Sequence, residues 1–317
     1  MRIQYKMESK SINSSLNSIV NSVCRSLAIW LSYTRPVCSF STIMICIALV
    51  SNYANAELTR LEIIQRITVA KGKSWDNSGP YERIVGKAHF AVDPQNLHNR
   101  AIVDLDKAPL NYRNRVEFAA DIVILKPVDN LKGNHTVLFE VPNRGGRGIV
   151  GFFNKKAAAN NDPEFADGFL LKQGFTMVWL GWQHDVPSRS GLLRLYAPIA
   201  TEHGDPITGP VRAQIILGKA SETASLGDRN HQPYLPFETE ISKAVMTVRN
   251  EVLDKQEVIE RSRWKFVGDP KSSDTTLSHV ILEGGFQPGK IYEVVYISSN
   301  PKWKAWDLRE FGILSLF

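Results

Sequence analysis

Residues 136–182 read TVLFEVPNRGGRGIVGFFNKKAAANNDPEFADGFLLKQGFTMVWLGW, and the expected fold depends on them. Two apolar runs in this stretch, residues 137–141 and 175–180, are rich in strand-forming residues and do not alternate between apolar and polar positions. Each is expected to be a strand buried on both faces, which is typical of parallel sheets covered by helices. Between the runs, Asp162 and Pro163 favour a helix start and Gly174 favours a helix stop. The stretch therefore predicts two neighbouring parallel strands bridged by a helix.

The loop at residues 142–148 follows the first of these strands. Ligands commonly bind at the carboxyl ends of parallel strands, because helix amino termini and free backbone N–H groups point there. The glycines of this loop allow the backbone to approach a ligand closely. In hydrolases of the α/β type, the loop after an early strand gives one N–H group to the oxyanion hole. A Pro-Asn-Arg-Gly-Gly sequence is also simply a good turn, and these residues alone favour the turn.

The composition describes a globular protein and excludes one class of partner. The 317 residues fit one large or two medium domains, with 43% hydrophobic and 22% charged residues. The first 56 residues hold five basic residues against one acidic residue, so they contribute +4 of the formal charge of +6 and leave +2 for the rest. No basic run with interleaved aromatics appears. We therefore expect no nucleic-acid partner.

Residues 1–56 are expected to be an export leader. The apolar stretch at residues 43–50 follows Arg35, and Ala54-Asn55-Ala56 is a small-residue cleavage pattern. Eight apolar residues are too few for a transmembrane helix, which needs roughly twenty, so we expect no stable membrane anchor and a periplasmic or extracellular location. All three cysteines lie in this leader, so the mature protein would have no disulfide. The alternative is a retained tail ahead of a short membrane-associated segment.

Residues 57–301 favour strands. Alternating patterns in the first part of this region predict a half-buried antiparallel layer ahead of the parallel unit. Short strand candidates separated by proline-containing loops predict an inserted β lobe at about residues 186–278. A third strongly apolar strand of the parallel sheet is expected at residues 291–297, followed by a tail at residues 302–317. The expected fold class is α/β, with a partial hydrolase-type sheet, a large antiparallel β-rich N-terminal layer and a β insertion.

The patterns of common catalytic and metal sites are missing from the sequence. No serine has glycine two residues before and two after, as a nucleophile elbow requires. Ser188 and Ser190 lie near His184 and Asp185, but neighbours in one short loop cannot reach the geometry of a catalytic triad. The histidines and carboxylates lack metal-ligand spacing. We expect no metal and no cofactor.

Several segments carry a more specific signal when they are taken together. They are LTRLEI at 58–63, GPYER at 79–83, IVDLD at 102–106, EVPNRG at 140–145, GWQHDVP at 181–187, TGPVR at 208–212 and LEGGF at 282–286. In this order they resemble a bacterial family of α/β-hydrolase domain-containing proteins, over about residues 58–301. The resemblance implies a secreted serine-hydrolase or esterase-like protein that acts on a small ester-like substrate.

The chain departs from this family at its end. The family continues with a nucleophile elbow, an acid and a histidine, and none of these follows residue 301 here. Only the oxyanion loop is carried over, with Asn143, Arg144, Gly145 and Gly146 as candidate backbone donors. The resemblance therefore implies the N-terminal part of a hydrolase that is inactive alone, and that a separate C-terminal half could complement.

The alternative function is a secreted β-rich module that binds a ligand without catalysis. Trp179, Trp182 and Tyr196 could line a sugar or lipid surface, although a buried core position is the commoner fate of such aromatics.

Overall fold

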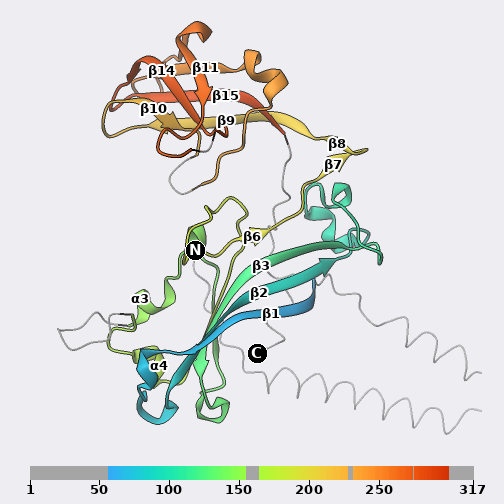
Figure 1. Cartoon of the computed structure of the whole chain (residues 1–317), viewed down its shortest axis with the longest axis vertical. Helices are drawn as coiled ribbons and strands as arrows, with labels where there is room; N and C mark the ends of the chain where they lie inside the picture. Colours follow the sequence, from blue (N-terminus) through green and yellow to red (C-terminus); the bar gives the residue numbers. More distant parts are fainter. Residues whose placement is uncertain (1–55, 155–163, 228–230, 274, 300–317) are drawn as a thin grey trace, which may run out of the picture.

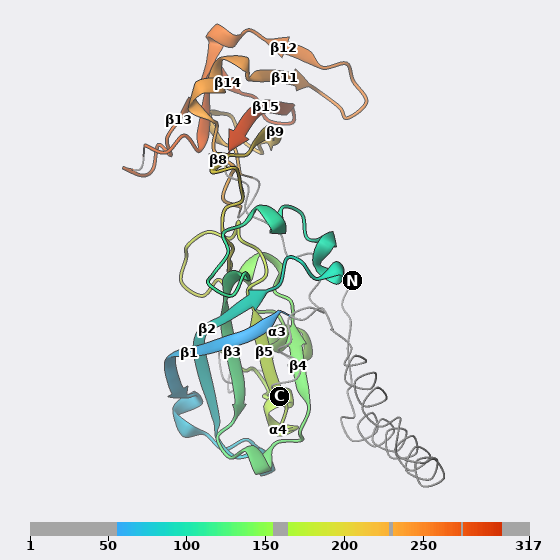
Figure 2. The ribbon, with the colours of Figure 1, turned by 90° about the vertical axis from the view of Figure 1, so that its right-hand side faces the viewer.

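The computed structural model describes residues 56–154, 164–227, 231–273 and 275–299, and its main strands form two separate lobes. The first lobe holds β1 to β6 and the second holds β9 to β15, at opposite ends of the molecule (Figures 1 and 2). The expected leader, apart from Ala56, and the expected tail at residues 302–317 lie outside the described residues.

The first lobe is built on a six-stranded sheet. Its strands are β1 (Glu57–Thr68), β2 (Tyr81–Val92), β3 (Val116–Pro127), β4 (Val137–Glu140), β5 (Thr176–Leu180) and β6 (Leu195–Tyr196). Their order is β1-β2-β3-β5-β4, and β6 pairs with β3. Every pair is antiparallel except β4 with β5.

The predicted parallel pair is confirmed. The register of β4 and β5 runs from Val137 opposite Thr176 to Glu140 opposite Trp179. Two short α-helices lie between these strands in the chain, α3 (Ile149–Phe153) and α4 (Phe169–Lys172). The stop expected at Gly174 is also found, because this residue has a φ of +76° and its N–H donates to the carbonyl of Leu171. Asp162 and Pro163 lie outside the described residues, but residues 164–168 are not helical, so the helix begins at Phe169, later than these two residues predict.

The central strands of this sheet are buried on both faces because a separate core covers each face. On β5, Val178 and Leu180 point into one core, whereas Met177 and Trp179 point into the other. Both α-helices pack on the second core, to which α3 contributes Ile149 and α4 contributes Leu170 and Leu171. The continuous apolar runs in the sequence follow from this double burial.

The expected α/β fold class is wrong. Across the described residues, β4 with β5 is a lone parallel pair at the edge of an antiparallel sheet, and α3 and α4 span only five and four residues. The apolar run at residues 291–297, expected as a third strand of the parallel sheet, belongs to β15 (Ile291–Ser299) in the other lobe. There it pairs antiparallel with β9 and β11. A continuous apolar run in the sequence predicts a buried strand, but it does not predict which core buries that strand.

The second lobe places two antiparallel sheets around one core. One sheet has the order β12-β11-β15-β9 and the other has the order β10-β14-β13. The bounds are β9 (Thr208–Ile216), β10 (Ser221–Ser225), β11 (Val245–Arg249), β12 (Glu257–Ile259), β13 (Trp264–Val267) and β14 (His279–Phe286). Aromatic side chains from both sheets fill the space between them, among them Trp264, Phe266 and Tyr296. This core makes the second lobe a folded unit in its own right.

Short elements connect the larger ones. The strands β7 (Thr201–Glu202) and β8 (Asp205–Pro206) form a two-stranded ribbon between the lobes. The 3-10 helices are η1 (Ala70–Gly72), η2 (Asp76–Ser78), η3 (Leu97–Ala101), η4 (Leu105–Lys107), η5 (Asn130–Lys132), η6 (Asn143–Gly145), η7 (Glu238–Lys243) and η8 (Arg261–Arg263). Within the described ranges, no helix has the length and apolar character needed to cross a membrane.

Candidate functional site

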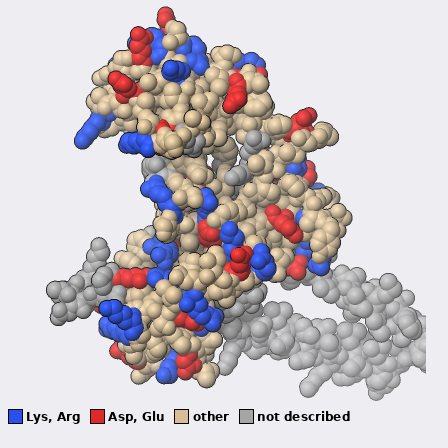
Figure 3. Space-filling model, in the orientation of Figure 1, with Lys and Arg blue, Asp and Glu red and all other residues tan. Residues whose placement is uncertain are grey.

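A cavity of about 380 Å³ lies where the two lobes meet. The loop after β5, at residues 182–185, forms its first wall together with Arg144. Residues 211–214 of β9 form a second wall, and the chain at residues 231–234 forms a third. The face shown in Figure 3 is hollowed between the lobes and carries acidic and basic side chains intermixed. The cavity thus brings together three segments that are far apart in the sequence.

Asp185 is the polar centre of this cavity. Its Oδ2 lies 3.5 Å from Nη1 of Arg144 and 3.4 Å from Nδ1 of His231. Its backbone carbonyl accepts the N–H of Gln232 at 2.6 Å. Asp185 of the first lobe therefore contacts the chain segment at residues 231–234, which follows β10. The side chains of Asp185, Arg144 and His231 remain 22%, 31% and 24% exposed, so each still has surface to offer a ligand.

The loop after β4 holds Arg144 in place through its backbone. The Arg144 N–H donates to Oε1 of Gln183 at 2.9 Å, and the Leu193 N–H donates to the carbonyl of Gly145 at 3.0 Å. Gly145 has a φ of +74°, and a Cβ there would lie 2.6 Å from the carbonyl oxygen of Leu193. This position needs glycine, because both the conformation and the space exclude a side chain.

The four oxyanion-loop candidates differ in whether they line the cavity. Arg144 lines the cavity, whereas Asn143, Gly145 and Gly146 are not among its lining residues. Two of the four N–H groups already have acceptors: Arg144 donates to Gln183, and Gly146 donates to the carbonyl of Asn143 at 3.1 Å. Their role as oxyanion donors was implied by the hydrolase resemblance alone, and it stays a prediction.

Aromatic side chains also line the cavity. The Trp182 Nε1–H donates to the carbonyl of Pro142 at 2.7 Å, which fixes the indole. The Tyr234 hydroxyl lies 3.4 Å from Nε2 of His184, and the Tyr296 hydroxyl donates to the carbonyl of Tyr234 at 2.6 Å. These contacts hold the rings before any ligand arrives.

Of the three aromatics proposed from the sequence, the structure places one at the cavity. Trp182 lines it. Trp179 is buried in the first lobe, where its Nε1–H donates to Glu140 at 2.6 Å. The ring of Tyr196 lies 3.8 Å from Nζ of Lys87 on the sheet. Ser188 and Ser190 also lie outside the cavity lining.

Burial raises the pKa of two tyrosines at the cavity, Tyr234 and Tyr296, and of Tyr81 in the core of the first lobe, above the ordinary value of 10.0. At Tyr234, the charge of Asp185 adds to this effect on the pKa. All three hydroxyls therefore stay protonated in the folded protein at pH values where an exposed tyrosine ionises.

These pKa shifts predict alkaline unfolding. Their contribution to stability should be complete below about pH 10, the ordinary tyrosine pKa. It should be lost as the pH rises further, because the unfolded chain ionises first and the folded chain retains its protons. Melting temperatures between pH 8 and pH 12, with absorbance at 295 nm to count ionised tyrosines, measure this. Tyr296→Phe should flatten the alkaline fall, and ionisation of all nine tyrosines near pH 10 before unfolding would contradict the prediction.

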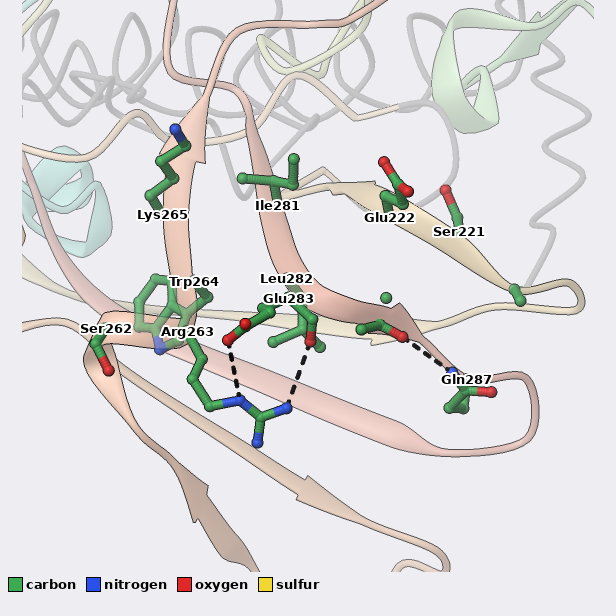
Figure 4. A pocket seen from close by; sticks show the side chains of 13 residues that line it. Ser221, Glu222, Ser262, Arg263, Trp264, Lys265, Ile281, Leu282, Glu283 and Gln287 are labelled. Atoms are coloured by element: carbon green, nitrogen blue, oxygen red, sulfur yellow. Dashed lines mark hydrogen bonds and ion pairs between the residues drawn. The ribbon is translucent and has the colours of Figure 1, made fainter.

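A second hollow, of about 840 Å³, lies on the outer face of the β10-β14-β13 sheet. Figure 4 shows that its charged side chains do not converge. Arg263 turns to Glu283, with Nε 3.6 Å from Oε2, whereas Lys265 extends away from this pair. The cavity between the lobes is the better candidate, because its polar side chains surround one space.

Among the described residues, no group of three or more His, Cys, Asp or Glu side chains is placed to hold a metal ion. Comparisons with models of known protein families, with curated proteins and with solved structures found no match. The hydrolase resemblance is thus wrong: no family model supports it, and across the described residues every strand pair except β4 with β5 is antiparallel, where that family alternates strands and helices. The shared segments are short strand and loop sequences, which different folds can contain.

Proposed function

We propose that this protein is a binding module that holds a small polar molecule in the cavity between its two lobes. The observation that carries the proposal is the convergence of Arg144, Asp185 and His231 on one cavity from separate chain segments. The volume of about 380 Å³ falls within the range of about 300–1,000 Å³ that is usual for small-molecule sites. The export expected from the sequence would place this module in the periplasm or outside the cell.

Fixed side chains favour binding because less conformational entropy is lost when the ligand arrives. The backbone of Arg144 is held by Gln183, its side chain lies 3.5 Å from Asp185, and the indole of Trp182 is held by Pro142. These contacts lie within the first lobe, so this wall is formed without a ligand. A molecule in the cavity would also contact β9, and it would thereby strengthen the connection between the lobes.

Gln232→Trp tests the site by filling it. The Gln232 side chain lines the cavity and is exposed, and its contact with Asp185 is made by the backbone, which the substitution keeps. The matched control is Gln65→Trp, at an exposed position on β1 outside the cavity. The full chain is titrated by calorimetry with glucose, glucose 6-phosphate, glutamate and octanoate as probes.

We expect at least one probe to bind to the wild type and to Gln65→Trp, and to bind at least tenfold more weakly to Gln232→Trp. Steric filling of the cavity is the reason for the loss. The proposal is wrong if no probe binds, or if a probe binds equally well to both variants.

A further inference from the structure

We infer that the ligand of this cavity is a neutral polyhydroxylated molecule, such as a monosaccharide or disaccharide. The inference rests on the proposed function and names the class of ligand. Three properties of the cavity carry it: the pairing of its charges, its mixture of donors and acceptors, and its aromatic wall.

The charged side chains of the cavity already have partners of opposite charge. Arg144 lies beside Asp185, whose Oδ2 also faces the imidazole of His231. Arg212 lies 3.2 Å from Glu293, a buried carboxylate on β15. An anion is normally held by a cation that has charge to spare, and here it would compete with Asp185 and Glu293. A cation would meet Arg144 and Arg212, so a neutral ligand avoids both conflicts.

The same side chains exclude an apolar ligand. Covering the exposed parts of Asp185, Arg144 and His231 with hydrocarbon would remove water from polar groups without replacing its hydrogen bonds. Guanidinium groups only donate, and carboxylates only accept. A hydroxyl group donates and accepts at once, so a ligand with several hydroxyls can satisfy both kinds of neighbour.

His231 supports the same ligand class. Its Nε2 is buried and has no hydrogen-bond partner within the described part of the chain. Because Nδ1 faces the Asp185 carboxylate, the neutral ring is expected to carry its proton on Nδ1 and to leave Nε2 as an acceptor. A hydroxyl that reaches Nε2 can donate to it. Ionised carboxylates cannot, since they only accept.

The aromatic wall supplies the apolar part of the site. Trp182, Tyr234 and Tyr296 border the cavity together with the apolar side chains of Val211 and Leu226. Rings with a fixed orientation can cover the C–H face of a sugar while polar groups hold its hydroxyls. Trp182 has this fixed orientation, because its Nε1–H is bonded to Pro142.

The test compares neutral sugars with negatively charged sugar derivatives. Glucose, galactose and maltose are titrated into the full chain by calorimetry, against glucuronate and glucose 6-phosphate. We expect at least one neutral sugar to bind at least tenfold more tightly than both anions. Asp185→Asn should weaken this binding about tenfold through loss of a charge-assisted hydrogen bond, whereas Asp205→Asn, exposed on β8, should not.

The outcomes separate this inference from the proposed function. Tighter binding of glucuronate or glucose 6-phosphate, if Gln232→Trp abolishes it, would overturn the ligand class and leave the cavity as the binding site. Sugar binding that Gln232→Trp does not change would overturn both proposals at this site. The absence of binding by all five compounds would overturn the ligand class, and octanoate or glutamate would then decide the proposed function.

Discussion

Glu293→Ala is expected to lower the free energy of unfolding by about 3–5 kcal/mol, the usual cost of removing one partner from a buried ion pair. Glu293 lies on β15 and is only 4% exposed. Its Oε1 lies 3.2 Å from Nη2 of Arg249 and accepts from Nε2 of Gln214 at 3.2 Å. Gln256 donates to Oε2. Arg249 dominates the expected loss, because its side chain is 14% exposed and its charge would be left without a carboxylate.

Denaturant unfolding, followed by tryptophan fluorescence, measures this loss. Glu257→Ala is the matched control, because Glu257 is an exposed residue on β12 in the same lobe. Its expected effect is within about 0.5 kcal/mol. Glu293→Gln should fall between the two, since an amide keeps one acceptor and loses the charge. Equal stability of the two alanine variants would show that the contacts of Glu293 contribute nothing to the lobe.

Glu293→Ala should also weaken ligand binding in the cavity. Glu293 contacts Arg212 and Gln214, and both of these residues line the cavity wall on β9. Glu293 is therefore a positioning residue for this wall. Its loss should weaken ligand binding even under conditions where Glu293→Ala remains folded.

Local pattern in the sequence predicts buried strands and one of their pairings correctly, but it does not predict the layers that cover them. The parallel pairing of β4 and β5 was predicted because their runs are continuous, and the stop at Gly174 was predicted from its residue type. The α/β class was not correct, because the covering layers were assigned to helices. Two separate cores bury these strands, and the side chains that form them come from the whole first lobe.

For the candidate site too, the sequence indicates residues in single loops but not the contacts between distant segments. The sequence indicates Arg144 because it lies in a glycine-rich loop after a buried strand, and it places Asp185 in the loop after the next strand. His231, Tyr234 and Arg212 gave no local signal. They reach the cavity only because the second lobe folds and meets the first, and no periodicity in the sequence encodes that contact. A polar residue inside an apolar run, such as Glu293, is the one sequence signal that could have indicated a buried network.

Glu140→Ala is expected to destabilise the first lobe by about 2–4 kcal/mol, because three N–H donors lose a charged acceptor. Oε2 of Glu140 accepts from the N–H of Gly148 at 2.8 Å, from the N–H of Ile149 at 2.7 Å and from Nε1 of Trp179 at 2.6 Å. Two of these donors belong to the start of α3, where a carboxylate also interacts favourably with the helix dipole. The third belongs to β5, so one side chain ties the end of β4 to both neighbours.

Denaturant unfolding of Glu140→Ala and Glu140→Gln, with Glu222→Ala at an exposed position of β10 as the control, tests this expectation. Glutamine keeps one carbonyl acceptor and should recover about half of the loss. The fluorescence of Trp179 should also change, and this change should be absent when Glu140→Ala is made in a Trp179→Phe background. If Glu140→Ala unfolds at the same denaturant concentration as Glu222→Ala, the carboxylate does not organise the loop. The wall of the cavity between the lobes would then depend on the contacts of Arg144 with Gln183 and of Trp182 with Pro142, and not on Glu140.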